Sequence, residues 1–429
     1  SNPEFSNSAI LSHIASVANS FTDLESEIAI HAGRWVMLAT HNSTTRVYHD
    51  ASGLKSVFYM LDSGTVAHLG STPAILEAAS MTQRDVHMIK DFQKYPNSGA
   101  WPVHQIPFTG VAQLLPNHYL DFATAKSIRF WPSGPIETFS LEEATERITE
   151  SIIGTINACN NRNACVISLT GGYDSRLILA AALSIHDNVK CFTSVRKDTP
   201  SFDHSIPRKI AKRYRLNHDF LFPDQSQSSD VERSYTELHD ILQENVSNMY
   251  YAPSRRTVVN IANFLSGRTS LSGNVSEIAR CFYYKDGVHP TVLSADDLAK
   301  RTGFNKNPYA IEGLTVWCET LPDGWNNQIL DLLYMEQRLG VWASAASTYR
   351  EAILDQQAPM NTREIAQIAL GVQSEYRREP YLLIQKCIEN LQPDLLQIPF
   401  NQDFQHLWAV YKREKVPLPW RLKRRLGWL

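Results

Sequence analysis

Short runs of alternating or clustered apolar residues fill the first third of the chain. Turn-forming sequences separate these runs, among them HNS, ASGLK and DSG. Runs of this length with one apolar face are typical of strands that cover a core on one side. The pattern therefore predicts an antiparallel β-rich region built from residues 33–40, 44–50, 56–61, 65–70, 110–122 and 127–132.

The pattern changes near Pro135, where we place a boundary between a first domain, residues 7–135, and a second, residues 136–429. Residues 140–161 have a serine at the expected N-cap, acidic residues in the first turn and apolar residues at helical spacing. Strand-like runs then alternate with helical segments, at residues 164–170, 189–196 and 218–222. This order predicts a parallel α/β unit, and the chain from about residue 229 onward is expected to be mostly helical.

The composition is that of an ordinary globular protein with 43% hydrophobic residues. Its 41 basic and 44 acidic residues give a net charge of −3, so we expect neither nucleic acid nor a membrane as a partner. No apolar run reaches the roughly 18 residues of a membrane span, and no signal-peptide pattern opens the chain. The cysteines form no C-x-x-C pair and are expected to be reduced and structural. We therefore expect a cytoplasmic protein. The opening SNPEFS is typical of a cloning remnant and is left out of the first domain.

The sequence VISLTGGYDSRLILAAAL, residues 166–183, contains the main candidate site. Its central loop, Thr170–Ser175, lies between a predicted buried strand and a predicted helix, where open α/β sheets bind ligands. Two glycines let the backbone approach an anion, and the first turn of the helix offers unsatisfied N–H groups. The loop predicts a pyrophosphate site. The alternative is an ordinary turn in which Asp174 and Ser175 cap the helix.

The acidic residue of this loop indicates a cation. A bare Asp174 carboxylate would repel a phosphate, so Mg²⁺ is expected between the two groups. The loop lacks the lysine of G-x-x-x-x-G-K-[ST], and this disfavours a Walker-type nucleotide triphosphatase.

The loop SLTGGYDSRL resembles the S-G-G-x-D-S pyrophosphate loop of the N-type ATP pyrophosphatases, and most closely that of the asparagine synthetase family, with Thr170 at the serine position. Other segments resemble the same family in the same order. Three of them resemble its N-terminal glutaminase-type domain, at His49–Tyr59, Gly70–Ala78 and Gly110–Leu120. Three more resemble its synthetase domain, at Ser201–Leu221 with Asp203 at an acidic position, Leu271–Tyr284 and Ala358–Leu370. The resemblance covers about residues 30–405.

The resemblance implies a fold and a site. The β-rich region would be the remnant of an N-terminal-nucleophile glutaminase fold, followed by an adenine-nucleotide α-hydrolase-like parallel α/β domain with a helical C-terminal part. ATP and Mg²⁺ are the implied cofactors, with Asp174 and Glu277 as metal ligands. The implied nucleotide-binding residues are Ser168, Leu169, Thr170, Gly171, Gly172, Tyr173, Asp174, Ser175, Thr193, Ser194 and Gly273. The implied catalytic residues are Asp174, Glu277 and Arg176, and a helix-surface position is the alternative for Arg176.

The N-terminal region departs from the family pattern. The family's glutaminase uses an N-terminal cysteine as its nucleophile, whereas the first cysteine here is Cys159. Glutaminase activity is therefore not expected, and the region is interpreted as a scaffold or docking surface. A sequence that lacks the start of this domain is the alternative explanation.

The synthetase region departs from the pattern as well. Asn274 stands at the first acidic position of the second motif, and Asn401 stands where the family has a lysine that contacts the pyrophosphate and the acyl-adenylate. Three basic residues could restore that charge or lie at the surface, Lys386, Arg377 and Arg378. Three residues after the second motif could line a substrate pocket, Arg280, Tyr283 and Tyr284, with core packing as the alternative for the tyrosines.

Together these observations predict an ATP-dependent, AMP-forming amide synthetase, a ligase that adenylates a carboxylate and transfers the acyl group to an amine or ammonia. The expected partners are a small-molecule or peptide carboxylate and an amine, and a homodimer is also considered. A sulfur-transferring or tRNA-modifying pyrophosphatase would prefer a catalytic cysteine pair and a basic face, and neither is visible. The alternative outside the enzyme class is a non-catalytic nucleotide-binding or partner-binding protein.

Overall fold

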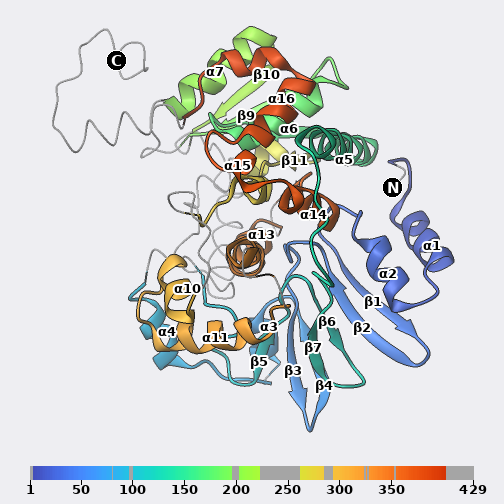
Figure 1. Ribbon diagram of the computed structural model, residues 1–429, viewed down its shortest axis with the longest axis vertical. Coiled ribbons are helices and arrows are strands. Elements are labelled where there is room, and N and C mark those ends of the chain that lie inside the picture. Colours follow the sequence, from blue (N-terminus) through green and yellow to red (C-terminus); the bar gives the residue numbers. More distant parts are fainter. Residues whose placement is uncertain are drawn as a thin grey trace.

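The computed structural model describes residues 3–79, 81–95, 100–195, 202–222, 261–284, 293–322, 325, 328–351 and 354–401. It confirms the expected α/β class, because two antiparallel sheets precede a five-stranded parallel sheet. In Figure 1 the parallel sheet and its helices lie at one end of the molecule and the antiparallel strands at the other, with α13 (Ser344–Glu351) between them. The predicted boundary near Pro135 falls in the segment that joins these two parts of the chain.

The antiparallel strands form two sheets, one in the order β1-β2-β6-β7 and one in the order β4-β3-β5. Their bounds are β1 (Val36–His41), β2 (Thr44–His49), β3 (Phe58–Asp62), β4 (Thr65–Gly70), β5 (Val111–Gln113), β6 (His118–Asp121) and β7 (Lys126–Arg129). The antiparallel region predicted from the apolar runs is therefore confirmed. The helices of this part are α1 (Asn7–Val17), α2 (Phe21–Ile28), α3 (Pro73–Ala78) and α4 (Val86–Phe92).

Strand β2 shows how both faces of the first sheet are covered. Val47 and Tyr48 follow each other in an extended strand, so their side chains point to opposite faces, and both are fully buried. Tyr48 belongs to one buried cluster with Leu24 and Ile28 of α2, whereas Val47 clusters with Tyr59 of the second sheet. The second sheet thus covers one face, and helix α2 covers the other.

The parallel sheet has the strand order β10-β9-β8-β11-β12. Its strands are β8 (Cys165–Ser168), β9 (Lys190–Ser194), β10 (Asn217–Leu221), β11 (Thr269–Leu271) and β12 (Asp355–Gln357). The first three are the predicted strands, but β11 and β12 lie in the region that was expected to be mostly helical. On one face of the sheet, helices α5 (Leu141–Arg162), α6 (Tyr173–Leu183) and α16 (Leu382–Leu391) pack against one another. Val166, Phe192 and Leu265 form a separate apolar cluster.

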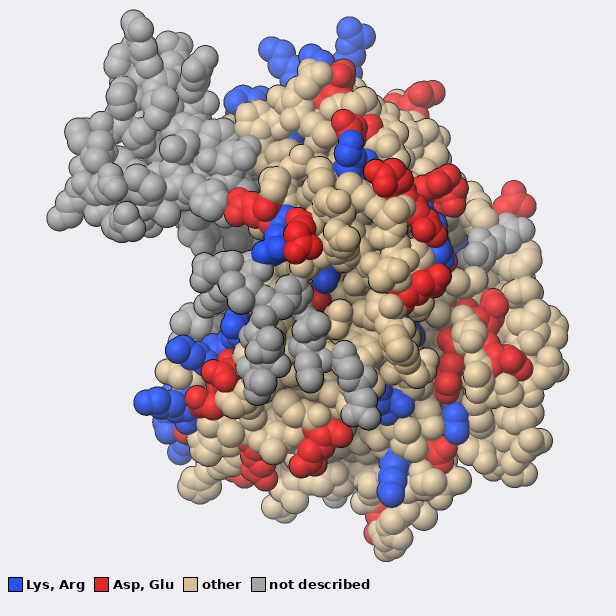
Figure 2. Space-filling view, viewed as in Figure 1, with Lys and Arg blue, Asp and Glu red and all other residues tan. Residues whose placement is uncertain are grey.

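The remaining described elements are α7 (Phe202–Tyr214), η2 (Ser276–Arg280), α10 (Ala295–Arg301), α11 (Pro308–Glu319), α12 (Ile329–Leu333), η5 (Tyr334–Ala343), α14 (Arg363–Gly371), α15 (Ser374–Arg377) and η6 (Pro393–Gln397). All six cysteines are free thiols, as expected. Within the described ranges, no helix has the length and apolar character needed to cross a membrane. On the face seen in Figure 2, the described basic and acidic side chains are interspersed.

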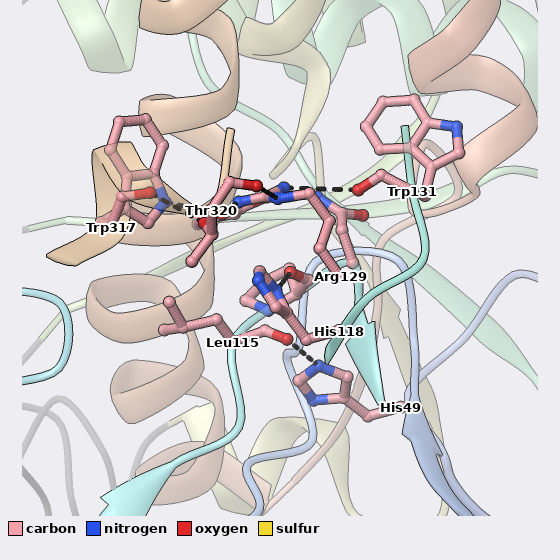
Figure 3. A network of polar contacts seen from close by, with 10 residues as sticks. His49, Leu115, His118, Arg129, Trp131, Trp317 and Thr320 are labelled. Atoms are coloured by element: carbon pink, nitrogen blue, oxygen red, sulfur yellow. Dashed lines mark hydrogen bonds and ion pairs between the residues drawn. The ribbon is translucent and has the colours of Figure 1, made fainter. Parts of the chain in front are cut away.

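One continuous helical segment, residues 329–351, joins the two parts of the molecule. It consists of α12, the π-helix η5 and α13, and we call it the central helix. Glu336 of η5 is fully buried, and both of its oxygens lie 2.5–2.7 Å from Arg129 of β7. Trp317 and Asn117 donate further hydrogen bonds to the same carboxylate, 2.7 and 2.9 Å long. Figure 3 shows Arg129, Trp317 and His118 in this network.

His118 lies in this network as a buried neutral side chain. Its Nδ1 is 2.8 Å from the Pro116 carbonyl oxygen, and its Nε2 is buried without a hydrogen-bond partner among the described residues. Burial lowers the pKa of His118 to about 4. The folded protein therefore takes up this proton only at a more acidic pH than the unfolded chain does.

We expect the free energy of unfolding to fall as the pH drops from about 6.5 to about 4, because in this window the unfolded chain binds a proton that folded His118 does not. The contribution is on the order of 3 kcal/mol at the acidic end of the window. His118→Asn keeps an N–H donor for Pro116 but cannot titrate, so its stability should depend less on pH. Urea unfolding across the window measures both proteins, and identical pH profiles would contradict the prediction.

Candidate functional site

The order of strands in the parallel sheet changes direction between β8 and β11. Strands β9 and β10 are added on one side of β8, and β11 and β12 on the other. The loops that follow β8 and β11 leave neighbouring strand ends in different directions, and open α/β sheets bind ligands at such a point. Thr170–Gly172 follows β8 and Ser272–Val275 follows β11, so the two motifs singled out in the sequence meet here.

Hydrogen bonds among its own residues shape the first loop. The Thr170 N–H donates to Ser175 Oγ over 3.0 Å, and the two hydroxyl oxygens lie 2.9 Å apart. The N-cap of α6 is Gly172, which has no side chain to cap the first turn and whose own N–H lies 3.4 Å from Thr170 Oγ1. The alternative in which Asp174 and Ser175 cap this helix is therefore wrong. The first turn of α6 keeps N–H groups and the positive end of the helix dipole for a ligand.

The chain near residue 400 runs directly along this loop. The Asn401 N–H donates to the Gly171 carbonyl oxygen over 3.0 Å, and its side-chain amide donates to Asp203 over 3.0 Å. Phe400 stacks on Tyr173 with ring centroids 3.7 Å apart. The structure thus brings Asn401 to the place where the resemblance puts a lysine, beside the loop, and an uncharged amide stands there.

Arg176 has a structural place that differs from the predicted catalytic one. Its side chain is fully buried, and its guanidinium donates to the carbonyl oxygens of Leu395, Ile398 and Pro399. The guanidinium carbon also lies 3.7 Å from the centroid of the Phe400 ring. This placement corrects both expectations for Arg176, since the residue is neither at the surface nor directed to a substrate. Its hydrogen bonds and its contact with Phe400 hold residues 395–400 against helix α6.

The second loop touches the first through a glycine. A Cβ atom at Gly273 would lie 2.5 Å from the carbonyl carbon of Asp174 and 2.7 Å from the Ser175 nitrogen, so only glycine fits. In the same loop, the Asn274 N–H lies 3.4 Å from Ser272 Oγ. Val275 has a φ of 77°, a left-handed conformation that is costly for a β-branched residue. The close contact and the strained residue together fix where the 3₁₀ helix η2 begins.

Helix η2 places Glu277 and Arg280 beside Asp174. Arg280 Nη2 lies 2.7 Å from Asp174 Oδ2 and 3.3 Å from Glu277 Oε1. The second Glu277 oxygen accepts a 2.7 Å hydrogen bond from the Tyr334 hydroxyl of the central helix. Burial raises the pKa of Asp174 above its usual range, and the charge of Arg280 opposes this rise. Burial would lower the pKa of Arg280, but the carboxylates of Asp174 and Glu277 raise it overall, so this guanidinium stays charged.

The predicted magnesium site does not fit this arrangement. Both Glu277 oxygens and one Asp174 oxygen already have partners, and only Asp174 Oδ1 is buried without one. Mg²⁺ takes about six oxygen ligands, whereas a guanidinium beside these carboxylates would repel it. Over the part of the chain that the structure describes, no cluster of three or more histidine, cysteine or acidic residues could hold a metal. The two acids are close together as predicted, but their shared partner is Arg280.

The strand ends beside the first loop carry the residues expected to hold a nucleoside. The Thr193 hydroxyl of β9 donates to the Leu169 carbonyl oxygen over 2.8 Å and lies 2.8 Å from His218 Nε2. The Leu169 N–H in turn donates to the carbonyl oxygen of Phe192 over 2.8 Å. Ser168 and Ser194 end β8 and β9, and both are half-buried. These residues form the edge of the sheet next to the loop.

The residues considered as replacements for the family lysine have acidic partners of their own. Lys386 and Arg378 form ion pairs of 2.6 and 3.0 Å with Glu389 and Glu375. Arg377 is buried and pairs with Asp331 over 3.0 Å. The Tyr284 hydroxyl donates to the same Asp331 over 2.9 Å, so the core alternative holds for this tyrosine.

An arginine of the central helix escaped the sequence analysis. Arg338, one turn after Tyr334 in the central helix, lies with its guanidinium carbon 3.6 Å from the Trp342 ring centroid and 5.5 Å from that of Phe282. Its Nε is buried, and it has no hydrogen-bond acceptor among the described residues. Phe282 and Tyr283 pack on Tyr334 with centroids 5.1 and 6.4 Å away. Arg338 therefore belongs to the same aromatic cluster as the residue that fixes Glu277.

Comparisons with known proteins add weak likenesses only. No protein-family model and no curated protein sequence matches this chain. The structure of NMN synthetase from Francisella tularensis is similar at 12% identity over 47% of this chain and 96% of its own, with a TM-score of 0.23. Phosphoadenylyl-sulfate reductase from Candida auris, in its phosphate complex, is similar at 15% identity over 46% and 94% of the two chains, with a TM-score of 0.21. Such scores carry no argument about function, and the resemblance to the asparagine synthetase family stays a prediction.

Replacement of Gly273 tests the contact between the two loops. Gly273→Ala should lower the free energy of unfolding by about 1–3 kcal/mol, because the new methyl group overlaps backbone atoms of α6. Gly154→Ala is the matched control, since Gly154 lies in α5 and a Cβ there meets no atom within 4 Å. Denaturant unfolding of both variants measures the difference. Equal stability of the two variants would mean that the loops do not approach as closely as described.

Proposed function

We propose that the protein is an ATP-dependent, AMP-forming amide synthetase that binds ATP through its pyrophosphate at the Thr170–Ser175 loop. The observation that carries this proposal is the position of the loop. It lies at the carboxyl end of β8, the strand that has β9 on one side and β11 on the other. It also begins helix α6, which has no side-chain cap. Backbone N–H groups at a helix N-terminus are suited to a phosphate chain.

The phosphate chain would lie against the backbone of Gly171 and Gly172, next to the side chains of Asn401 and Asp203, which would lie 3.2 and 3.4 Å from a Cβ at Gly171. The N–H groups of Tyr173 and Asp174 would donate to phosphate oxygens, whereas the Gly172 N–H already donates to Thr170 Oγ1 over 3.4 Å. Arg280, which stays charged beside this turn, would offset part of the negative charge of the ligand. The adenosine would lie over the strand ends at Ser168, Leu169, Thr193 and Ser194, as the resemblance to asparagine synthetases implies.

The proposed reaction has two steps. A substrate carboxylate oxygen attacks the α-phosphorus, so that a C–O–P bond forms, the α–β phosphoanhydride breaks and pyrophosphate leaves. An amine or ammonia then attacks the acyl carbon, loses a proton and releases AMP. The protein positions the reactants and stabilises charge, and no covalent bond to a side chain is needed.

Arg338 supports a binding place for the carboxylate substrate. Its guanidinium is stacked on Trp342, and its buried Nε has no hydrogen-bond acceptor among the described residues, so an anion bound here would supply a partner. A guanidinium binds a carboxylate with two parallel hydrogen bonds. Phe282 and Tyr283 would cover the apolar part of the substrate. Tyr334 links this cluster to Glu277 and so to the nucleotide site.

The N-terminal part is proposed to support the synthetase part without glutaminase activity. No cysteine precedes Cys159, which lies in α5, beyond the antiparallel sheets. In this proposal the amine reaches the site from solution or from a partner protein.

One observation favours a second candidate, a nucleotide-binding protein that has lost adenylation. Asn401, which the resemblance puts at the position of the family's lysine, donates its backbone N–H to Gly171. Its side-chain amide donates a hydrogen bond to Asp203 and carries no charge for a phosphate. Without that charge the protein could bind the nucleotide and transmit its presence to a partner.

Exchange of labelled pyrophosphate into ATP tests the proposed function. With the correct carboxylate from a panel of amino acids, hydroxy acids and peptides, we expect exchange that requires the carboxylate. Ser175→Ala removes the hydroxyl that shapes the loop and should slow exchange about tenfold or more, while Ser184→Ala at the other end of α6 should not. ATP binding without exchange on any carboxylate would favour the second candidate, and absence of ATP binding would refute both.

A second experiment addresses the substrate side. Arg338→Met keeps an unbranched side chain on Trp342 but removes the charge, so the KM for the carboxylate should rise by about 10- to 100-fold with little change in ATP affinity. Arg147→Met is the matched control, because Arg147 also lies over an aromatic ring, that of Phe139, far along the chain in α5. An unchanged KM in Arg338→Met would remove this residue from the substrate site.

A further inference from the structure

Arg280 joins the two acidic residues of the site by direct contacts. The same nitrogen, Nη2, lies 2.7 Å from Asp174 and 3.3 Å from Glu277. The Arg280 side chain is 12% exposed, and those of Asp174 and Glu277 are 26% and 31% exposed. A cation between two partly buried carboxylates favours their charged forms, and the Arg280 guanidinium lies where it has this effect.

The surroundings hold Arg280 in this position. Its guanidinium carbon lies 5.3 Å from the ring centroid of Tyr381, and Tyr334 fixes the far oxygen of Glu277. Two non-glycine residues with left-handed backbone flank η2, Val275 with a φ of 77° and Cys281 with a φ of 50°. Such conformations persist only where packing and hydrogen bonds impose them. The position of Arg280 is therefore fixed by the surrounding structure, unlike that of an exposed side chain that forms an ion pair at the surface.

The arrangement leaves one donor and one acceptor without a partner. Arg280 Nε and Asp174 Oδ1 are buried, and neither has a hydrogen bond among the described residues. A guanidinium has five N–H donors, so contacts to two carboxylates leave others for an anionic ligand. A divalent ion requires several oxygen ligands, and one free carboxylate oxygen does not provide them.

We propose that Arg280 is the resident cation of this site, which takes the place of a divalent metal between Asp174 and Glu277 and donates to the phosphates of the ligand. The pair of acids then binds no metal of its own. The metal-excluding part of this proposal stands independently, whereas the contact with phosphate rests on the proposed ATP binding. Arg280 would let the site attract a phosphate chain before any metal is present.

Binding of Mn²⁺ to the nucleotide-free protein, measured by electron paramagnetic resonance, tests the first part. The wild-type protein should bind the same amount of Mn²⁺ as Asp174→Asn, because the acids are already paired. Arg280→Gln keeps the length of the side chain but frees both carboxylates, so it should gain one Mn²⁺ site that Arg280→Gln with Asp174→Asn loses again.

The result in the wild-type protein decides this part even if Arg280→Gln fails to fold. A stoichiometric Mn²⁺ site in the wild-type protein that disappears in Asp174→Asn would overturn the proposal. No gain of Mn²⁺ in a folded Arg280→Gln would also overturn it, because the acids would then be unable to hold a metal for reasons unrelated to Arg280.

Calorimetric titration with inorganic pyrophosphate in the presence of EDTA tests the second part. The wild-type protein should bind pyrophosphate, and Arg280→Gln should weaken this binding by about tenfold or more. Arg213→Gln is the control, since Arg213 is an exposed arginine that also pairs with an acid, Asp394. Pyrophosphate that binds only after Mg²⁺ is added would overturn the role of Arg280. Absence of binding under both conditions, together with the expected Mn²⁺ results, would instead contradict the proposed function and leave the metal-excluding role of Arg280 intact.

Discussion

The burial of Glu336 is the constraint on which the arrangement of the molecule depends. A carboxylate with no exposed surface must be paired, and here its partners come from β7, from α11 and from the turn at Asn117. Removal of one partner of such a pair typically costs about 3–5 kcal/mol, because the other charge remains buried. Arg129 and Glu336 therefore fix the antiparallel sheets against the central helix. Burial acts against the charged form of Glu336, yet Arg129 and the other donors lower the pKa of Glu336 overall.

The central helix carries this constraint to the candidate site. Tyr334 lies two residues before Glu336 and holds Glu277, whereas Gln337 and Gly340 contact the N-terminal part through Val103 and Gln113. A Cβ at Gly340 would lie 2.3 Å from Pro116 Cδ, so the approach of the two parts requires glycine here. The segment is a π-helix, a form that is rare and is found mainly as local insertions at functional sites. Tyr334 of this π-helix thus faces the candidate site, whereas Gln337 and Gly340 face the N-terminal part.

Several parts of this organisation could be read from the sequence and others could not. The apolar runs located β1 to β10, because each of these strands overlaps an apolar run of at least five residues, and β5 lies inside the longer run 110–122. Strands β11 and β12 were missed, since TSL and DQQ have three residues each and carry no apolar pattern. The resemblance implied that the two glycine-containing loops and Asn401 belong to one site, and in the structure Gly273 contacts Asp174 and Asn401 contacts Gly171. Arg280 was noted only as a pocket candidate, and Arg338 not at all. Arg280 lies between Asp174 and Glu277 because of the packing of the folded chain. These two acids are 103 residues apart, so no local sequence pattern indicates the contact.

The place of Arg176 has a consequence for how the protein is assembled during synthesis. Its carbonyl acceptor at Leu395 lies 219 residues further along the chain, so Arg176 finds this partner only after that later segment has been made. Until that later segment arrives, the guanidinium remains hydrated and cannot enter the core. Helix α6 thus completes its packing only when some of the last described residues reach it. A chain that ended before residue 395 would leave the Arg176 guanidinium without these acceptors, so α6 would be packed less stably in it.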